Sequence, residues 1–340
     1  MRILLIRLGA FGDIIHTLPL AADLAAAGHD IGWCCEDRWA SLVTGSPAVR
    51  WLHPLPRKFL RDRQRGIGPR LAVVRQLFSS IRAKQYDVVI DAQGLAKSAV
   101  ISLLSGIPER VGHGRPRARE CSWLVGNRRS VTSAVHVIDQ QRALAGAIGV
   151  TSTGDWHFPL PTWQAEHHWA AATLTQLQME RPWMLNVGAG WPTKVWPEER
   201  LREFLGQASQ RRLPVLVLWG SAGERAVAER VIAQAHYGVL APDTDLPRLA
   251  ALLSRAAVVI SGDTGPLHLA LAVGVPTVGL FGPVPAERNG PRGRGHRTLQ
   301  APGALWERQD VTKVSMGAIT PEQVFQSAHE AMADCTLLLA

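Results

Sequence analysis

The octapeptide SGDTGPLH at residues 261–268 holds the residue types with the clearest chemistry in this chain. An apolar run at 257–260 precedes it, as expected of a buried parallel strand. An apolar segment at 267–272 follows it, as expected of a buried helix. Because proline favours the first position of a helix, Pro266 predicts that Gly265 caps this one. The sequence therefore predicts a strand, a tight turn and a helix start.

This helix start predicts a binding site for an anion. We expect unpaired backbone N–H groups there, at the positive end of the helix dipole, on Thr264, Gly265, Leu267 and His268. Asp263, at the tip of the strand, can accept hydrogen bonds from hydroxyls, and the side chain of His268 can donate one. A sugar linked to a diphosphate satisfies all of these groups.

A second candidate follows the first strand, in the sequence GAFGD at 9–13. Its two glycines permit a tight turn and a close approach by a ligand. Asp13 stands at a helix start, where a carboxylate either caps the helix or takes a proton from an acceptor hydroxyl. The position alone favours neither role.

Two loops in the second half add further candidates. Small residues at 188–190 let the backbone N–H groups of Ala189 and Gly190 approach a phosphate, and Lys194 can neutralise a leaving diphosphate. A lone loop lysine is more often simply solvated. Glu224 lies beyond another strand, where an acidic residue can hold both hydroxyls of a ribose. Of the two roles, this position slightly favours a carboxylate that only stabilises a helix start.

Basic residues are in excess and gather in the first half. The 340-residue chain has 37 Lys and Arg against 28 Asp and Glu, a formal net charge of +9. This excess suits a nucleic acid, an anionic membrane or a phosphorylated substrate, unless it only solvates the surface. We interpret 54–71 as a mobile basic loop, because Gly66, Gly68 and Pro69 break a helix there.

Short apolar strands alternate with helices in both halves, which a Pro-, Thr-, Gly- and Trp-rich linker at 151–163 separates. The pattern predicts an α/β protein with two Rossmann-like domains that face each other across a cleft, with ligands at the carboxyl ends of the strands. We expect the first domain at 1–155, the second at 156–320, and a C-terminal helix at 321–340 that packs back on the first domain. Single helices are expected at 96–104 and, with an amphipathic pattern, at 135–148.

Several classes of protein are disfavoured by what the sequence lacks. It has no apolar run of about 18 residues, as a membrane span requires, and its start does not resemble a signal peptide. Its four cysteines lack the spacing of a metal finger, so we interpret them as reduced thiols of a cytosolic protein. No cluster of Asp and His suggests a metal.

With these motifs placed, the chain resembles glycosyltransferase family 9 over nearly its whole length. Within that family it resembles the subfamily of heptosyltransferase I, the first heptosyltransferase of lipopolysaccharide core synthesis. Four sequence blocks carry the resemblance: GDIIHTLP at 12–19, YDVVIDAQGL at 86–95, KVWPEE at 194–199 and DTGPLH at 263–268. The subfamily is indicated mainly by residues 90–98 and 118–120.

The resemblance implies the two-domain architecture called GT-B and an inverting reaction without metal or cofactor. The implied donor is ADP-L-glycero-β-D-manno-heptose, and the implied acceptor is the 3-deoxy-octulosonate (Kdo) of Kdo-lipid A. The enzyme would then work in the cytoplasm, peripheral to the cytoplasmic face of the inner membrane, with contact to anionic lipid and none to nucleic acid.

The resemblance also implies roles for individual residues. Asp13 falls on the position of the catalytic base. The positions that bind the donor are Ala189, Gly190, Lys194, Glu224, Thr244, Asp263, Thr264, Gly265 and His268. The side chains expected to meet the phosphates and carboxylates of the acceptor are Arg57, Lys58, Arg61, Arg63, Gln93, Lys97 and Arg119.

Three alternative functions are weighed against this one. The first is a family 9 enzyme that uses ADP-heptose or a related nucleotide sugar on another acceptor, such as a second core heptose, another glycan or a protein. A nucleotide-dependent dehydrogenase is disfavoured, because the first strand lacks a following GxGxxG. A non-catalytic binder of nucleic acid or membrane is also disfavoured, because no strand combines aromatic and basic residues as RNA-binding sheets do.

Overall fold

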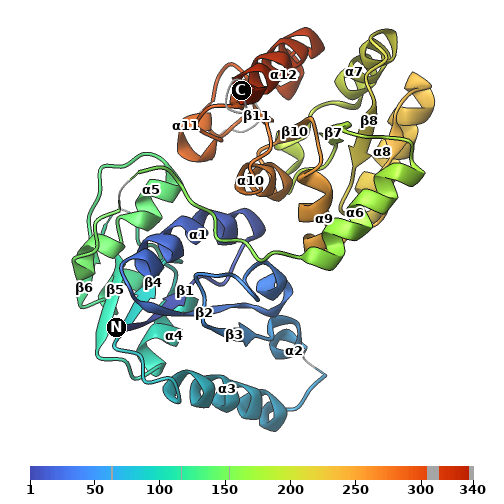
Figure 1. Ribbon diagram of the computed structural model, residues 1–340. Helices are drawn as coiled ribbons and strands as arrows, with labels where there is room; N and C mark the ends of the chain where they lie inside the picture. The colour runs from blue at the N-terminus through green and yellow to red at the C-terminus, as the bar shows by residue number, and fades with distance from the viewer. Residues whose placement is uncertain (63, 116, 153, 305–313, 337–340) are drawn as a thin grey trace. The chain divides into compact units, whose positions relative to one another are not determined.

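The protein folds into two compact units, Met1–Thr162 and Trp163–Ala340, each built on one six-stranded parallel sheet (Figure 1). The predicted α/β class with two Rossmann-like sheets is confirmed. In the chain, the units meet a few residues beyond the expected boundary. This computed structural model describes residues 1–62, 64–115, 117–152, 154–304 and 314–336.

The sheet of unit 1 has the strand order β3-β2-β1-β4-β5-β6. Its first strand is wholly buried from Ile3 to Ile6, which explains the near-continuous apolar run in the sequence. The order reverses between β1 and β4, and ligands bind outside the carboxyl ends of the strands at such a point. The strands are β1 (Arg2–Ile6), β2 (Asp30–Glu36), β3 (Trp51–Leu55), β4 (Val88–Asp91), β5 (Glu109–His113) and β6 (Arg128–Ser130).

Helices cover both faces of this sheet (Figure 1). Two of them, α1 and α5, pack against each other. On the other side, Leu77, Phe78 and Ile81 of α3 and Ile101 of α4 join the buried side chains of the strands in one core. The helices are α1 (Phe11–Ala26), α2 (Arg57–Arg61), α3 (Ile67–Arg82), α4 (Ala96–Leu104) and α5 (Val137–Arg142), so the helix predicted at 96–104 is confirmed.

Two other predictions for unit 1 are wrong. The segment 54–71 is not a continuous loop, because α2 lies within it and α3 already begins at Ile67. Pro69 is the third residue of α3, where its missing N–H has no partner inside the helix to lose. The single helix predicted at 135–148 ends at Arg142, and a separate 3₁₀ turn follows at Ala145–Ile148.

The sheet of unit 2 repeats the topology of unit 1, with the order β12-β11-β10-β7-β8-β9. Its order reverses between β7 and β10, so the loops after these two strands stand at the switch point. The strands are β7 (Trp183–Asn186), β8 (Val215–Leu218), β9 (Val239–Leu240), β10 (Val258–Gly262), β11 (Thr277–Phe281) and β12 (His296–Gln300).

The last helix of the described chain, α12, packs on β10, β11, β12 and α7 of unit 2. Its expected packing on the first domain stays a prediction. The helices of unit 2 are α6 (Gln164–Gln176), α7 (Glu198–Gln210), α8 (Ala222–Ala235), α9 (Leu246–Leu253), α10 (Gly265–Ala272), α11 (Ala286–Asn289) and α12 (Pro321–Thr336).

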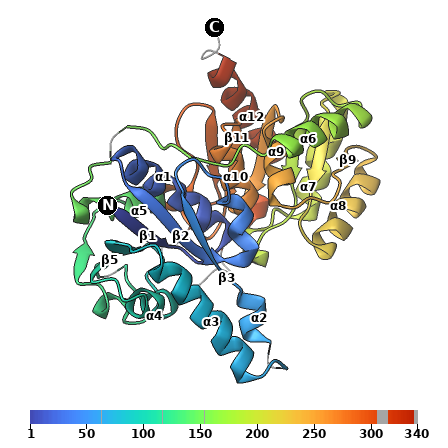
Figure 2. The same cartoon turned by 60° about the horizontal axis from the view of Figure 1, so that its bottom comes forward.

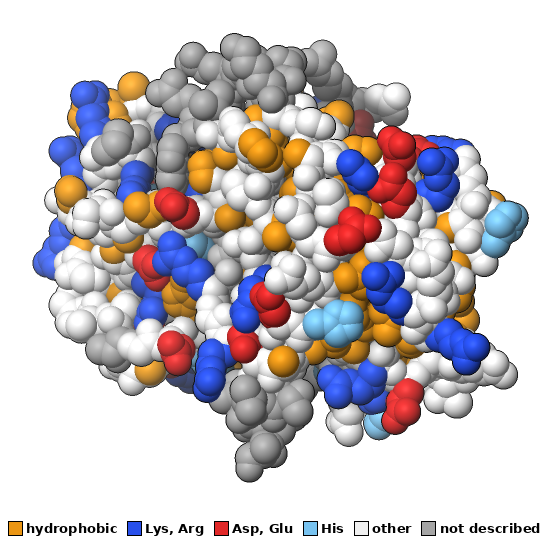
Figure 3. Space-filling model, turned by 90° about the horizontal axis from the view of Figure 1, so that it is seen from above, with side chains coloured by type: hydrophobic (Ala, Val, Ile, Leu, Met, Phe, Trp, Pro, Cys, Tyr) orange, Lys and Arg blue, Asp and Glu red, His pale blue; other side chains and the backbone are white. Residues whose placement is uncertain are grey.

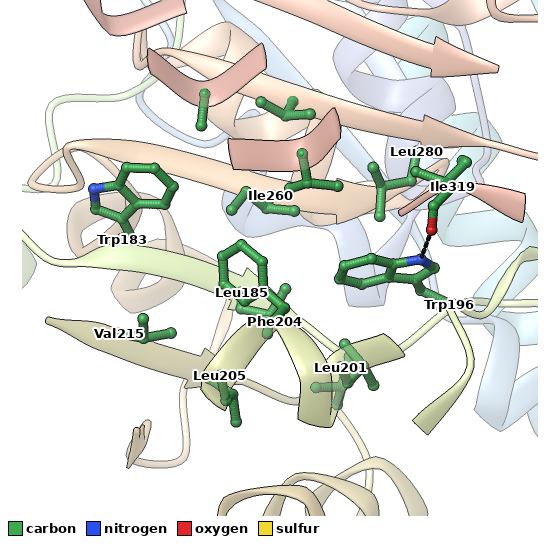
Figure 4. Packing of buried hydrophobic residues seen from close by; sticks show 14 of the residues in the cluster. Trp183, Leu185, Trp196, Leu201, Phe204, Leu205, Val215, Ile260, Leu280 and Ile319 are labelled. Carbon is green, nitrogen blue, oxygen red and sulfur yellow. Dashed lines mark hydrogen bonds between the residues drawn. The ribbon is translucent and has the colours of Figure 1, made fainter. Parts of the chain in front are cut away.

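Aromatic side chains from several elements pack among the aliphatic residues that make up most of the core of unit 2 (Figure 4). The rings of Phe204 on α7 and Phe325 on α12 stack with 4.5 Å between their centroids, and Trp183 of β7 packs 5.5 Å from Phe325. Trp196 is buried in the same core and donates its indole N–H to the carbonyl of Ile319 at 3.1 Å. This anchor fixes the end of the loop that carries Lys194.

Basic and acidic side chains are mixed on the face seen in Figure 3, with hydrophobic side chains between them. Among the described residues, no helix has the length and apolar character needed to cross a membrane. Cys34, Cys35, Cys121 and Cys335 are free thiols, as predicted. Burial raises the pKa of the Cys34 thiol to about 12, so this cysteine is a neutral core residue.

Candidate active site

Loops at the carboxyl edge of the unit 2 sheet carry the predicted donor-binding residues. Two of these loops follow the neighbouring strands β7 and β10, and a third follows β8. Parallel strands end at one edge of a sheet, so the fold brings the loops together at the switch point. The predicted residues on these loops, or in the first turn of the helix that follows, are Ala189, Gly190, Lys194, Glu224, Asp263 and Thr264.

Asp263 is the electrostatic centre of this edge. Its side chain is 4% exposed, and the ammonium group of Lys194 donates to its Oδ2. The Nε2 atom of His268 lies 3.3 Å from Oδ1, which also accepts from the side-chain amide of Asn289. Asp263 thus holds Lys194 and His268 at the tip of β10, and the sugar contacts expected of it stay a prediction.

The charge state of Asp263 follows from these neighbours. Burial raises the pKa of its carboxyl group. The hydrogen bond and charge of His268, together with the charge and hydrogen bond of Lys194, outweigh burial and hold this pKa well below its usual range. The carboxylate is therefore a fixed negative charge.

The helix start next to Asp263 differs in detail from the prediction. Helix α10 begins at Gly265, so its N-cap is Thr264 and not Gly265. The N–H of His268 donates to the carbonyl of Thr264 at 3.4 Å, so the prediction that this group is unpaired is wrong. Gly265 and Leu267 lie in the first turn, where helix geometry leaves N–H groups for an anion.

Asn186, at the end of β7, ties the two switch-point loops of unit 2 together. Its amide donates to the carbonyl of Gly188 at 2.9 Å, to the hydroxyl of Ser261 at 3.0 Å and to that of Thr264 at 3.3 Å. A Cβ atom on Gly262 would lie 2.9 Å from the carbonyl of Lys194, so the close approach of the loops needs glycine there. Sequence reasoning missed Asn186, because an asparagine at a strand end carries no distinctive signal.

Glu224 and Thr244 follow strands β8 and β9 of the same unit. Glu224 stands in the first turn of α8, where its carboxylate accepts the N–H of Gly220 at 2.8 Å. It also lies over Gly188, since a Cβ atom there would be 2.1 Å from Glu224 Oε1. Glu224 therefore stabilises a helix start, and its contact with a ribose stays a prediction. Thr244 is half-buried just before Asp245, the N-cap of α9.

Asp13 stands at the switch point of unit 1, in the first turn of α1. Its Oδ2 accepts the N–H of Ala10 at 3.0 Å, so this residue does stabilise the helix start. The same atom lies 2.7 Å from Nη2 of Arg7, whose side chain is 7% exposed against 38% for Asp13. Sequence reasoning missed Arg7, because it looks like an ordinary strand end.

The loop after β4 braces the loop that carries Asp13. Oε1 of Gln93 accepts the N–H of Leu8 at 3.0 Å and that of Gly9 at 3.4 Å. The guanidinium of Arg7 also donates to the carbonyl of Ala92. Buried Asp91 shapes this loop by accepting the N–H of Gln93 at 2.9 Å. Of the predicted acceptor-binding residues, Gln93 is thus a support for the loop before Asp13.

Glu36, at the end of β2, gathers cations from three segments. Its side chain is 2% exposed and lies 2.9 Å from Arg57, 2.9 Å from Arg38 and 3.5 Å from Lys97. Burial alone raises the pKa of Glu36, but the hydrogen bond from Arg57 and the charges of Arg57, Arg38 and Lys97 give a net lowering. Two predicted acceptor-binding residues, Arg57 and Lys97, are therefore brought together around one buried carboxylate.

The remaining predicted acceptor-binding residues fall into two groups. Lys58, Arg61 and Arg119 are exposed. The backbone N–H of Arg119 donates to the carbonyl of Gly94 at 3.0 Å, which places its segment beside the loop after β4. Arg63 lies outside the described residues. Within the described ranges, no group of three His, Cys, Asp or Glu residues is arranged to hold a metal ion.

Comparisons with known proteins find relatives and solved structures that match most of this chain. The lipopolysaccharide heptosyltransferase 1 of Pseudomonas aeruginosa is 32% identical over 301 residues, which are 86% of this chain and 82% of the relative. The solved structure of Escherichia coli heptosyltransferase WaaC with ADP matches with a TM-score of 0.80 and 26% identity, over 97% of this chain and 100% of that one. The structure of WaaC with ADP-2-deoxy-2-fluoro heptose matches with a TM-score of 0.77 and the same identity, over 97% and 99%.

The fold and these matches define a glycosyltransferase of the GT-B class. Residues 74–316 match the description glycosyltransferase family 9 (heptosyltransferase), and this chain belongs to that family. The resemblance found in the sequence is confirmed, and so is the predicted class of enzyme.

Proposed function

We propose that this enzyme transfers L-glycero-D-manno-heptose from ADP-heptose to the Kdo of Kdo-lipid A, a step in the synthesis of the lipopolysaccharide inner core. One observation carries the proposal. Lys194 and the first turn of α10 stand at the switch point of unit 2, and Asp13 stands at that of unit 1. The chain that carries them is similar to a lipopolysaccharide heptosyltransferase 1 over 86% of its length.

The diphosphate of the donor is the group that the unit 2 edge suits best. Lys194 supplies a positive charge that Asp263 holds at the tip of β10. The first turn of α10 adds N–H groups at the positive end of a helix. These groups stabilise the negative charge that develops on ADP as it leaves, as the donors of an oxyanion hole do.

Asp13 is the proposed general base. Among the described residues, the ion pair and hydrogen bond to its carboxylate both go to Oδ2, so Oδ1 is left for an acceptor hydroxyl. As the hydroxyl proton moves to Asp13, the hydroxyl oxygen forms a bond to the anomeric carbon of the heptose. The bond from that carbon to the diphosphate breaks on the opposite side, and its electrons stay on ADP. The anomeric configuration inverts.

The cations of unit 1 support an acidic, phosphorylated acceptor. Arg57 and Lys97 pair with different carboxylate oxygens of Glu36, and Lys58, Arg61 and Arg119 of the same unit are exposed. Guanidinium groups match phosphates and carboxylates in shape and charge. We further propose that these cations bring the enzyme to the anionic cytoplasmic face of the inner membrane.

Mass spectrometry tests the reaction. The purified enzyme is incubated with ADP-heptose and Kdo-lipid A, and the expected product carries one added heptose. A parallel sample contains a core glycan that already bears its first heptose. If this second acceptor gains a heptose and Kdo-lipid A does not, the proposed acceptor is wrong and the enzyme adds a later sugar.

A further inference from the structure

Helices α2, α3 and α4 lie near one another in unit 1 (Figure 2). Side chains of these helices line an apolar groove of about 340 Å³. This volume lies within the usual range for a small-molecule site. The side chains that make the groove apolar include Leu60, Val74, Phe78, Val100, Ile101 and Leu104. None of these residues belongs to the donor site or to the proposed base.

The apolar surface continues past the rim of this groove. A second hollow of about 600 Å³ lies along α3 and shares Val74, Phe78 and Leu104 with the first. Val100 and Leu104 remain 52% and 48% exposed, although they face these hollows. A contiguous exposed apolar surface of this kind marks a binding site more often than chance.

The charges around the hollows indicate which kind of ligand fits there. Arg57, Arg61 and Lys97 line the first hollow together with one carboxylate, that of Glu36. The second hollow adds two further arginines and no acidic residue. An apolar floor with a cationic rim is complementary to an anionic amphiphile and disfavours a neutral apolar peptide.

The groove is continuous with the loops that we assign to the acceptor. Leu8 and Glu36 line it, and both lie at the carboxyl edge of the unit 1 sheet. The N–H of Leu8 donates to Gln93, and Arg7, the next residue toward the N-terminus, pairs with Asp13. A ligand whose polar head lies at the proposed base therefore has an apolar site within reach of its tail.

We propose that this groove binds a fatty acyl chain of the anionic glycolipid acceptor. The inference rests on the proposed function, because it assumes an acceptor that is both acylated and phosphorylated. It makes α2, α3 and α4 a specificity site for the lipid part of the acceptor, separate from the residues that act on the sugar.

The test compares two acceptors with one matched pair of variants. KM is measured for Kdo-lipid A and for the same acceptor after removal of its acyl chains, at saturating ADP-heptose. Leu104→Gln places an amide in the groove, whereas Leu103→Gln changes a neighbour on α4 that is 54% exposed and is not among the groove residues. We expect Leu104→Gln to raise KM for the acylated acceptor by roughly fivefold or more, and to leave KM for the deacylated one unchanged. Leu103→Gln changes neither.

Two results would overturn the acyl-chain site. One is an equal KM of the unaltered enzyme for both acceptors, and the other is an equal effect of the two variants. If Leu104→Gln instead weakens binding to phosphatidylglycerol vesicles without changing the KM ratio, the surface contacts the bilayer and the assignment is wrong.

A binding measurement separates this inference from the proposed function. The fluorescence of cis-parinaric acid, a fatty acid probe, reports occupation of the groove without any transfer reaction. We expect saturable binding that Leu104→Gln weakens severalfold and Leu103→Gln does not. Absence of transfer to both acceptors would overturn the proposed function, and absence of probe binding would overturn the groove assignment.

Discussion

The guanidinium of Arg7 lies 2.7 Å from the carboxylate of Asp13, and the two residues stand on either side of the turn that follows β1. Arg7 is buried and also donates to the carbonyl of Ala92 in the loop after β4. It therefore fixes the orientation of the proposed base from a buried position directly after β1.

Replacing Arg7 tests this positioning role. We expect Arg7→Gln to lower kcat about tenfold, because a misaligned base transfers a proton poorly, and to leave KM for ADP-heptose unchanged. Arg7→Lys restores part of kcat, since it keeps the charge. Steady-state kinetics with varied donor make the measurement, and a rise in donor KM at normal kcat would show that Arg7 acts elsewhere.

Lys194 is the cation that we expect to stabilise the leaving ADP. We expect Lys194→Gln to lower kcat/KM for ADP-heptose about 10²-fold, as loss of one oxyanion donor does, while the amide still donates to Asp263. Arg212→Gln, at an exposed position of the same unit, serves as the control and keeps full activity. Equal activity of the two variants would remove Lys194 from the donor site.

The stability of unit 1 depends on pH through a buried histidine. His53 lies 2.7 Å from the hydroxyl of Tyr86 and 2.9 Å from that of Ser80, and burial lowers its pKa to about 4. The unfolded chain, with an ordinary histidine pKa of about 6.5, binds more protons between these values, so stability is lost as the pH falls from about 6.5 to 4.

The variant His53→Gln checks this dependence. The free energy of unfolding in urea, measured from pH 7 to pH 4.5, should fall less steeply for His53→Gln than for the unaltered protein. His157→Gln, at an exposed site, keeps the original slope. An unchanged slope in His53→Gln would mean that other groups cause the acid sensitivity.

Salt should weaken binding of the acceptor more than binding of ADP. The side chains of Lys58, Arg61 and Arg119 are exposed, so ions screen their attraction for an acidic acceptor. Lys194, 20% exposed beside buried Asp263, is screened much less. Raising the salt concentration from about 0.05 to 0.5 M should therefore increase KM for the acceptor more than Kd for ADP. Equal increases would count against this assignment of the acceptor cations.

Much of this fold can be predicted from periodicity and turn residues. The helix at 96–104 and the loops around Asp13, Lys194 and Asp263 follow from apolar runs that end in Gly, Asp or Pro. The segment 54–71 could not be predicted in this way. Its Gly and Pro residues suggest a break in helix, but Pro69 occupies a first turn, where proline is tolerated.

The ion pairs of the site also could not be predicted from the sequence. Glu36 meets Arg57 and Lys97 only because β2 ends beside α2 and α4. Arg7 and Asp13 are close in the chain, but whether their side chains meet depends on the turn between them. Local patterns identify which residue types stand at strand ends, and tertiary contacts decide which of them pair.

Asp13→Asn tests the central claim most directly. The amide keeps the shape of the side chain and removes the base, so kcat for heptose transfer to Kdo-lipid A should fall by about 10²- to 10⁴-fold. The Kd for ADP should stay unchanged, since the residues predicted to bind the donor lie in unit 2. A kcat close to that of the unaltered enzyme would contradict the account, because some other group would then accept the proton.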